Sequence, residues 1–290
     1  MRISGLQTAG TPGDVEANLR ELDAHCARAR AAGSELLVTP ELFLTGYDIG
    51  DRVRELARAD LTTPVRELAR RHGLALVVGL PEQSGGGCYN SACFVGPDGR
   101  ILGHHRKTHL FGDLDRRYFT PGDRLTSLVD YGGLRIALLI CYDAEFPENV
   151  RAAALAGADL VAVPTAQMEP YAFVADHVLR VRAWENQVYV VYANHDGAEG
   201  SLTYVGRSSV TAPSGEVLDR IGHGTGLVTA DVDPRAVARA RADNPYLLDR
   251  RPELYATAPS APAATAAATA PVAPAPSAPS ARPAPEDRTC

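Results

Sequence analysis

The residues of this 290-residue chain that could do chemistry include a cysteine, Cys141, which directly follows the apolar run LRIALLI. The chain continues YDAEFPE, and Pro147 in this segment is a residue that favours the first turn of a helix. A strand that passes through a turn into a helix places a thiol near a helix N-terminus. There the thiol pKa falls, and backbone N–H groups can bind an oxyanion. Cys141 is therefore a candidate nucleophile, although a free cysteine alone is more often a buried core residue.

A second candidate, Glu41, follows the short apolar run ELLVTP and is surrounded by the apolar residues of PELFLTGY. Burial disfavours the charged form of a carboxyl group and raises its pKa toward neutrality, as a general base requires. The alternative interpretation is a glutamate that faces water at the start of a helix.

The third candidate is Lys107, the single lysine among 29 basic residues, in the segment HHRKTHLF. All other basic residues are arginines, so one compact ammonium group suggests a position that needs it. Chance in an arginine-rich chain and a solvated basic strand edge are the alternatives. The three candidates each stand at the carboxyl end of a strand-like run, from which they could converge on one pocket.

Taken together, these segments resemble the nitrilase superfamily of carbon–nitrogen hydrolases. PELFLTGY, HRKTHLF and ICYDAEFPE occur in the family's order and at comparable separations, and the resemblance covers about residues 1–250. It implies that Glu41 is the general base, Lys107 the cation that stabilises a tetrahedral oxyanion, and Cys141 the nucleophile that forms a thioester. It also implies that the enzyme needs no metal and no organic cofactor. Members often carry a glutamate shortly after the lysine, and Asp115, one methylene shorter, is the candidate here.

The residues after the nucleophile favour an amidase that acts on a small primary amide. True nitrilases tend to have Trp-Glu where this chain has Tyr142-Asp143. Glu145 occupies the place where members that act on anionic substrates often have arginine, so we expect a substrate with an amino group, such as an amino-acid amide. An ion pair between Glu145 and Arg151 is the alternative role. Further candidates for the pocket wall are Tyr47, Tyr142, Phe146, Gln167 and Asn194, whereas His195 is expected to be structural.

Other functions remain open at this point. An N-carbamoyl amine hydrolase would use the same three residues, and a true nitrilase is a second enzyme alternative. A catalytically idle dimeric scaffold or a thiol redox sensor would use the fold without amide turnover.

The elements that must position these residues alternate between strands and helices. The apolar runs LALVVGL, LRIALLI and VYVVYA predict strands covered on both faces, and about ten strands with about five helices predict an α/β domain with more than one sheet. VGRSSVTAP is predicted as one strand, and residues 172–187 as a helix. The resemblance implies a four-layer α-β-β-α sandwich with two mixed sheets. It also implies a homodimer, or a larger homo-oligomer, whose layers continue across the interface.

Composition limits the remaining possibilities. A net charge of −6 provides no basic surface for nucleic acid, and no apolar run is long enough to cross a membrane. The amino terminus lacks a signal-peptide pattern, so a cytoplasmic protein is expected. Five scattered cysteines give neither a disulfide framework nor a zinc motif. Residues 256–290 contain 14 alanines and 8 prolines and are predicted to be a disordered tail behind a hydrolase domain of residues 1–255.

Overall fold

The computed structural model describes residues 1–255. The chain divides into two compact units, Met1–Asp249 and Arg250–Cys290, and the described part of the second contains the short helix α8 (Pro252–Tyr255). The predicted tail, residues 256–290, lies outside the described residues, and the predicted boundary after residue 255 stays a prediction. Within residues 1–255 no helix is both long enough and apolar enough to cross a membrane.

Two six-stranded mixed sheets form the centre of the first unit. In the first sheet β1, β2 and β3 are parallel, and its strands are, in spatial order, β14 (Gly226–Asp231), β1 (Arg2–Gln7), β2 (Leu36–Val38), β3 (Ala75–Ser84), β4 (Gly87–Val95) and β5 (Ile101–Arg106). In the second sheet β7, β8 and β9 are parallel, and its strands are β13 (Val217–Arg220), β12 (Ser209–Thr211), β9 (Tyr189–Asn194), β8 (Leu160–Thr165), β7 (Leu134–Leu138) and β6 (Ser127–Tyr131).

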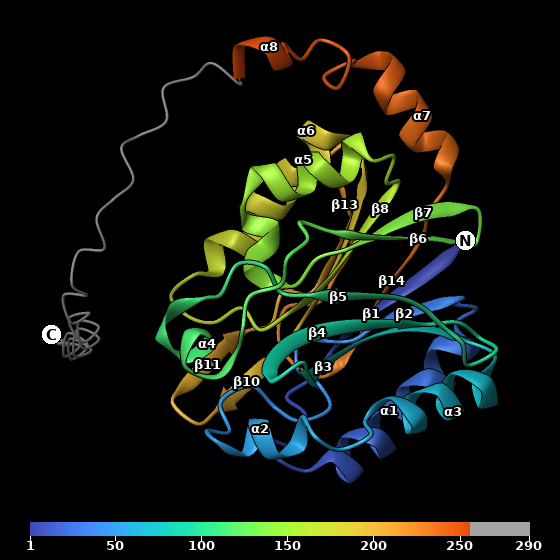
Figure 1. Cartoon of the computed structure of the whole chain (residues 1–290). Coiled ribbons are helices and arrows are strands. Elements are labelled where there is room, and N and C mark those ends of the chain that lie inside the picture. Colours follow the sequence, from blue (N-terminus) through green and yellow to red (C-terminus); the bar gives the residue numbers. More distant parts are fainter. Residues whose placement is uncertain (256–290) are drawn as a thin grey trace, which may run out of the picture. The chain divides into compact units, whose positions relative to one another are not determined.

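Helices cover the outer face of each sheet (Figure 1). The first sheet carries α1 (Val15–Ala31) and α3 (Thr62–His72), and the second carries α5 (Pro147–Leu155) and α6 (Leu179–Asn186), which a π-helical turn, η2 (Val174–Val178), precedes. Another helix, α7 (Pro234–Asp243), follows β14.

The alternation of side chains along each strand explains the layers. In β3, Ala75 and Val77 belong to the core between the two sheets, whereas Leu76 and Val78 pack with residues of α1 and α3. In β8, Leu160 and Ala162 likewise join the core between the sheets, and the intervening valines pack against α5 and α6. Because strand side chains point alternately to opposite faces, strands that are apolar at every position require cover on both sides. The predicted four-layer α-β-β-α sandwich with two mixed sheets is thereby confirmed.

Several short elements were absent from the sequence interpretation. They are α2 (Arg52–Leu56), α4 (Gly112–Tyr118), the 3₁₀ turn η1 (Cys141–Glu145) and the hairpin of β10 (Asp196–Glu199) and β11 (Leu202–Val205). The prediction of a single strand over VGRSSVTAP was wrong, because β11 ends at Val205 and β12 begins at Ser209. Between them Gly206 and Arg207 adopt φ values of 61° and 60°, which no extended strand accommodates.

Candidate active site

Three strand ends meet where the two sheets face each other. Lys107 directly follows β5, whereas Glu41 and Cys141 are each the third residue after the end of β2 and β7. The backbone N–H of Glu41 donates to the carbonyl of Thr165 at the end of β8, 3.2 Å away, so the loop after β2 is tied to the second sheet. The loop that carries Glu41 is therefore fixed against β8, the neighbour of β7 in the second sheet.

The backbone at the nucleophile candidate is strained. Cys141 has φ = 47° and Leu42, next to Glu41, has φ = 49°, values that cost a residue with a side chain about 1–3 kcal/mol. The buried carboxylate of Asp143 holds the turn in place: it accepts hydrogen bonds from the N–H of Ile140 at 3.2 Å and from that of His109 at 2.8 Å. The strained turn is thus fastened to the segment that follows Lys107.

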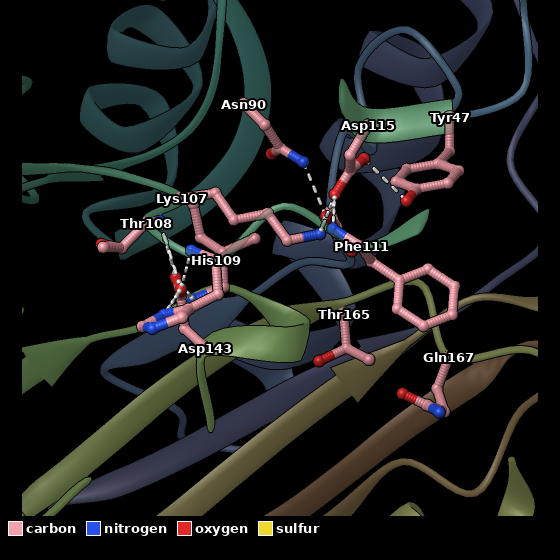
Figure 2. Close-up of polar contacts among 12 residues, drawn as sticks. Tyr47, Asn90, Lys107, Thr108, His109, Phe111, Asp115, Asp143, Thr165 and Gln167 are labelled. Atoms are coloured by element: carbon pink, nitrogen blue, oxygen red, sulfur yellow. Dashed lines mark hydrogen bonds and ion pairs between the residues drawn. The ribbon is translucent and has the colours of Figure 1, made fainter. Parts of the chain in front are cut away.

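The amine of Lys107 lies between two carboxylates (Figure 2). Its Nζ donates to Glu41 Oε1 and to Asp115 Oδ2, each at 2.7 Å, and all three side chains are fully buried. Burial by itself lowers the pKa of Lys107, but the charges of Asp115 and Glu41 outweigh it and hold this pKa well above its ordinary value. Tyr47 completes the arrangement, because its hydroxyl donates to Asp115 Oδ1 at 2.8 Å. Lys107 is therefore a fixed cation.

Glu41 has one oxygen held in place and one free. Its Oε1 accepts from Lys107 and, at 2.6 Å, from the side-chain amide of Asn90. Its Oε2 is buried and has no hydrogen-bond partner among residues 1–255. Burial raises the pKa of Glu41, and the charge of Asp115 adds to this, although Lys107 opposes it. A basic oxygen without a partner can accept a proton from a neighbouring group, as a general base must.

The Cys141 thiol differs from the expectation for a cysteine at a helix N-terminus. Burial raises its pKa well above the ordinary value, and the charge of Glu41 raises it further, whereas Lys107 and a hydrogen bond from the backbone of Ala166 favour the thiolate. The predicted fall in pKa was wrong because η1, not the start of α5, carries the cysteine, and because the thiol is buried. The neutral thiol is therefore the favoured form of Cys141, and its deprotonation would need a base.

Two of the aromatic residues predicted at the pocket wall, Tyr142 and Phe146, lie in and directly after the turn that carries Cys141. The ring of Tyr142 makes edge-to-face contacts with Phe111 at 5.2 Å and with Phe146 at 4.8 Å between centroids. Glu145 lies beside them, partly buried, and burial raises its pKa to about 7 although Lys107 and Arg182 oppose the rise. Its charge also contributes to the raised pKa of the Cys141 thiol. The predicted pairing with Arg151 stays a prediction.

Two other predicted wall residues, Gln167 and Asn194, are hydrogen-bonded to each other. Asn194 Oδ1 accepts from the N–H of Gln167 at 2.7 Å, and its Nδ2 donates to the carbonyls of Gln167 and Gly206. Asn194 therefore supports the segment after β8, and a direct contact with substrate stays a prediction for both residues. His195, expected to be structural, contacts the carbonyl of Glu41 through Nε2 at 2.7 Å.

The sequence interpretation missed residues that support the site. Asp143 lies within ICYDAEFPE, so the motif itself contained that signal, whereas nothing in the sequence points to Asn90 or Gly79. A Cβ on Gly79 would lie 2.4 Å from the carbonyl oxygen of Pro40 and 2.6 Å from the nitrogen of Leu42. Only glycine permits the segment that carries Glu41 to approach β3 this closely.

Comparison with known proteins gives consistent matches. The sequence model of the carbon–nitrogen hydrolase family matches residues 2–242. A protein of Pseudomonas protegens named "Hydrolase in pqqF 5'region" is 45% identical and covers 88% of this chain and 90% of its own. An (R)-stereoselective amidase of Pseudomonas sp is 38% identical, over 87% of this chain and 92% of its own, and an omega-amidase of Danio rerio is 33% identical, over 82% and 91%.

A solved structure is also similar to this chain. A mutant amidase from Nesterenkonia sp. AN1, 38% identical, has a TM-score of 0.81 and covers 88% of this chain and 98% of its own. In that structure acrylamide has undergone Michael addition at the active-site cysteine.

Proposed function

Because this chain belongs to the carbon–nitrogen hydrolase family, we propose that it is an amidase that hydrolyses small primary amides to a carboxylate and ammonia at Cys141. One observation carries the proposal: the buried amine of Lys107 fixes one oxygen of Glu41 and leaves the other oxygen without a hydrogen-bond partner among the described residues, while the charge of Glu41 acts on the pKa of the Cys141 thiol. The amidase names of the relatives support the same reaction class.

In the proposed mechanism Glu41 Oε2 takes the thiol proton while the sulfur attacks the amide carbon. The oxygen of the tetrahedral intermediate becomes negative, and Lys107 and the backbone N–H of Tyr142 stabilise it, by about 3–4 kcal/mol for one such donor. Glu41 then gives its proton to the departing nitrogen, which leaves as ammonia, and a thioester to Cys141 remains. Water attacks this thioester as Glu41 removes its proton. The thiolate then leaves and takes that proton back from Glu41, which restores the thiol and the base, and the acid product is released and ionises to the carboxylate. Asp115 keeps Lys107 charged and directed at the site.

The direct test is ammonia release from a panel of amides by the wild-type protein. Turnover of amides without nitrile turnover supports the amidase and excludes a true nitrilase. Release of carbon dioxide together with ammonia would identify the N-carbamoyl amine hydrolase instead. A protein that turns over no amide, but forms a reversible sulfenic acid or disulfide at Cys141, would be the redox sensor.

We propose further that the substrate bears an amino group, because of Glu145. Its carboxyl is partly buried and close enough to act on the charge of Cys141, and an anion there attracts a cation and repels an anion. Among the relatives, the omega-amidase represents by its name the alternative of an ω-amide substrate. Amino-acid amides fit the charge at Glu145, and ω-amides of diacids do not.

This specificity should depend on pH around the pKa of Glu145, about 7, which burial raises. Below this pH the carboxyl is neutral, so the preference for an amide with a primary alkylamine over its uncharged isostere should grow by about tenfold in kcat/KM between pH 6 and pH 8. The alkylamine of this probe stays protonated over this range, because its ordinary pKa is about 10, whereas the α-amino group of an amino-acid amide, with an ordinary pKa of about 8, would itself titrate. In Glu145→Gln the growth should disappear. The exposed Glu148→Gln is the matched control and should keep it; a wild-type preference for diacid monoamides would contradict the proposal.

The predicted homodimer also belongs to the proposal. On the outer side of the second sheet, exposed apolar side chains lie at the start of η2 and along α6. Phe173 is 67% exposed, Val181 50% and Trp184 45%. An exposed apolar face of this kind favours association with another copy. We expect light scattering after size exclusion to give at least twice the monomer mass. The Val181→Arg, Trp184→Arg variant should shift toward the monomer and the Ile101→Arg control should not. A monomeric wild type would contradict the dimer. The cytoplasmic location stays a prediction.

A further inference from the structure

A buried carboxylate outside the proposed catalytic residues contacts the loop that carries Tyr47. Glu199, at the end of β10, is 3% exposed. Its Oε1 accepts from the backbone N–H of Tyr47 at 2.6 Å and from that of Asp48 at 3.0 Å. Its Oε2 accepts from the hydroxyl of Tyr204 at 2.7 Å. Bonds between a charged acceptor and backbone donors are stronger than neutral ones, so this carboxylate fixes the loop firmly.

The loop that carries Tyr47 and Asp48 and the hairpin of β10 and β11 hold each other by contacts in both directions. In return, the carboxylate of Asp48 accepts from the N–H of Ser201 at 3.0 Å. A Cβ on Gly46 would lie 2.7 Å from Glu199 Oε1, and a Cβ on Gly200 would lie 2.4 Å from Asp48 Oδ2. Glycines at both points, each with positive φ, therefore permit the close contact.

Tyr47 connects this contact to the reacting groups. Glu199 holds its backbone, and its hydroxyl donates to Asp115 Oδ1 at 2.8 Å. The other oxygen of Asp115 accepts from Lys107, which in turn donates to Glu41. A shift of the Tyr47 backbone would move the hydroxyl away from Asp115. Asp115 would then be less firmly held, and the position of the Lys107 amine between Asp115 and Glu41 would shift.

We propose that Glu199 is a positioning residue for catalysis, which acts through Tyr47 on Asp115 and thereby on Lys107. This inference rests on the proposed amidase function. The chain of contacts is the evidence: each link is a hydrogen bond between buried groups, and Glu199 itself touches none of Glu41, Lys107 or Cys141 by a hydrogen bond. Replacement of such a residue changes the positions of the catalytic groups, while the groups that transfer protons and form the thioester remain the same.

A double-mutant cycle tests the proposal in the full-length chain. Glu199→Ala should lower kcat by about 100-fold, the loss expected for a small displacement of catalytic groups, with KM within about threefold. Glu199→Gln keeps an acceptor for the two N–H groups and should regain about tenfold of that loss. In a Tyr47→Phe background, which already lacks the bond to Asp115, Glu199→Ala should lower kcat by less than about fivefold, because contacting residues are not additive.

Asp60→Ala is the matched control, because Asp60 also accepts from two successive backbone N–H groups, those of Thr62 and Thr63, at the start of α3. Its kcat should stay at the wild-type value. If Glu199→Ala does not fold, the cycle is run with Glu199→Gln. An unchanged kcat, or an equal loss in both backgrounds, would overturn the positioning role. If wild type releases no ammonia, the proposed function fails by itself, and the same cycle is read by the rate of iodoacetamide alkylation at Cys141.

Discussion

Cys141→Ala is expected to reduce ammonia release to below about 10⁻⁴ of the wild-type kcat, the scale on which loss of a catalytic nucleophile acts. In the proposed mechanism the sulfur forms the covalent intermediate, and the amine of Lys107 cannot replace it, because this amine is charged and held by two carboxylates. A steady-state ammonia assay measures the loss. Binding of the amide should persist, because alanine removes only the thiol and leaves the η1 turn and its Asp143 contacts in place.

Cys93→Ala is the matched control for this variant. Cys93 is also buried, with a pKa that burial raises to about 11, but it belongs to the core between the first sheet and its helices. Its replacement should cost about 1 kcal/mol of unfolding free energy and leave kcat unchanged. Retention of amide turnover in Cys141→Ala would mean that the reaction does not pass through a thioester, and the proposed mechanism would have to be given up.

Glu41→Gln is expected to lower kcat for amides by about 10³-fold, within the range that general acid–base catalysis contributes. Glutamine preserves an acceptor for Lys107 and Asn90 but cannot take the thiol proton, and the thiol pKa is raised, so little thiolate forms without the base. With an activated ester as substrate, acylation of Cys141 depends less on a general base than hydrolysis of the thioester does, because the leaving group departs without protonation. Intact-mass spectrometry should therefore show one acyl group per chain accumulating on this variant.

The pH dependence gives a second measurement on the same residue. Burial raises the pKa of Glu41, so activity should be lost on acidification through an apparent pKa above the ordinary value of about 4.3. Protonation removes the base, and the acid limb should be absent from the residual activity of Glu41→Gln. The double variant with Cys141→Ala must show no acyl adduct. An adduct there would place the acyl group on another residue, and full activity in Glu41→Gln would exclude Glu41 as the base.

The main elements and the three catalytic candidates could be predicted because their signals are local. Apolar runs such as LALVVGL and LRIALLI require cover on both faces, and this alone predicts strands inside a layered α/β fold. Glu41, Lys107 and Cys141 lie in short motifs at strand ends, and the match over residues 2–242 confirms the family that those motifs indicated.

The pKa values of the site residues depend on the complete fold. A cysteine before a proline-opened helix predicts a lowered pKa, yet burial raises the pKa of the Cys141 thiol. The difference arises because desolvation depends on all the atoms packed around a group, and these come from both sheets and their connecting loops. The same packing holds Lys107 charged between two carboxylates.

The sequence by itself thus determined the layers, the motif residues and the class of chemistry, since each depends on residues close together in the chain. Only the tertiary structure decided which oxygen of Glu41 is free, that Asn90 holds the other oxygen, and that Glu199 contacts Tyr47. Glu199 lies 152 residues from Tyr47 in the chain, and its hairpin gives no strong periodic pattern. Contacts of this kind form only when distant segments pack together, so no local rule of composition or spacing can specify them.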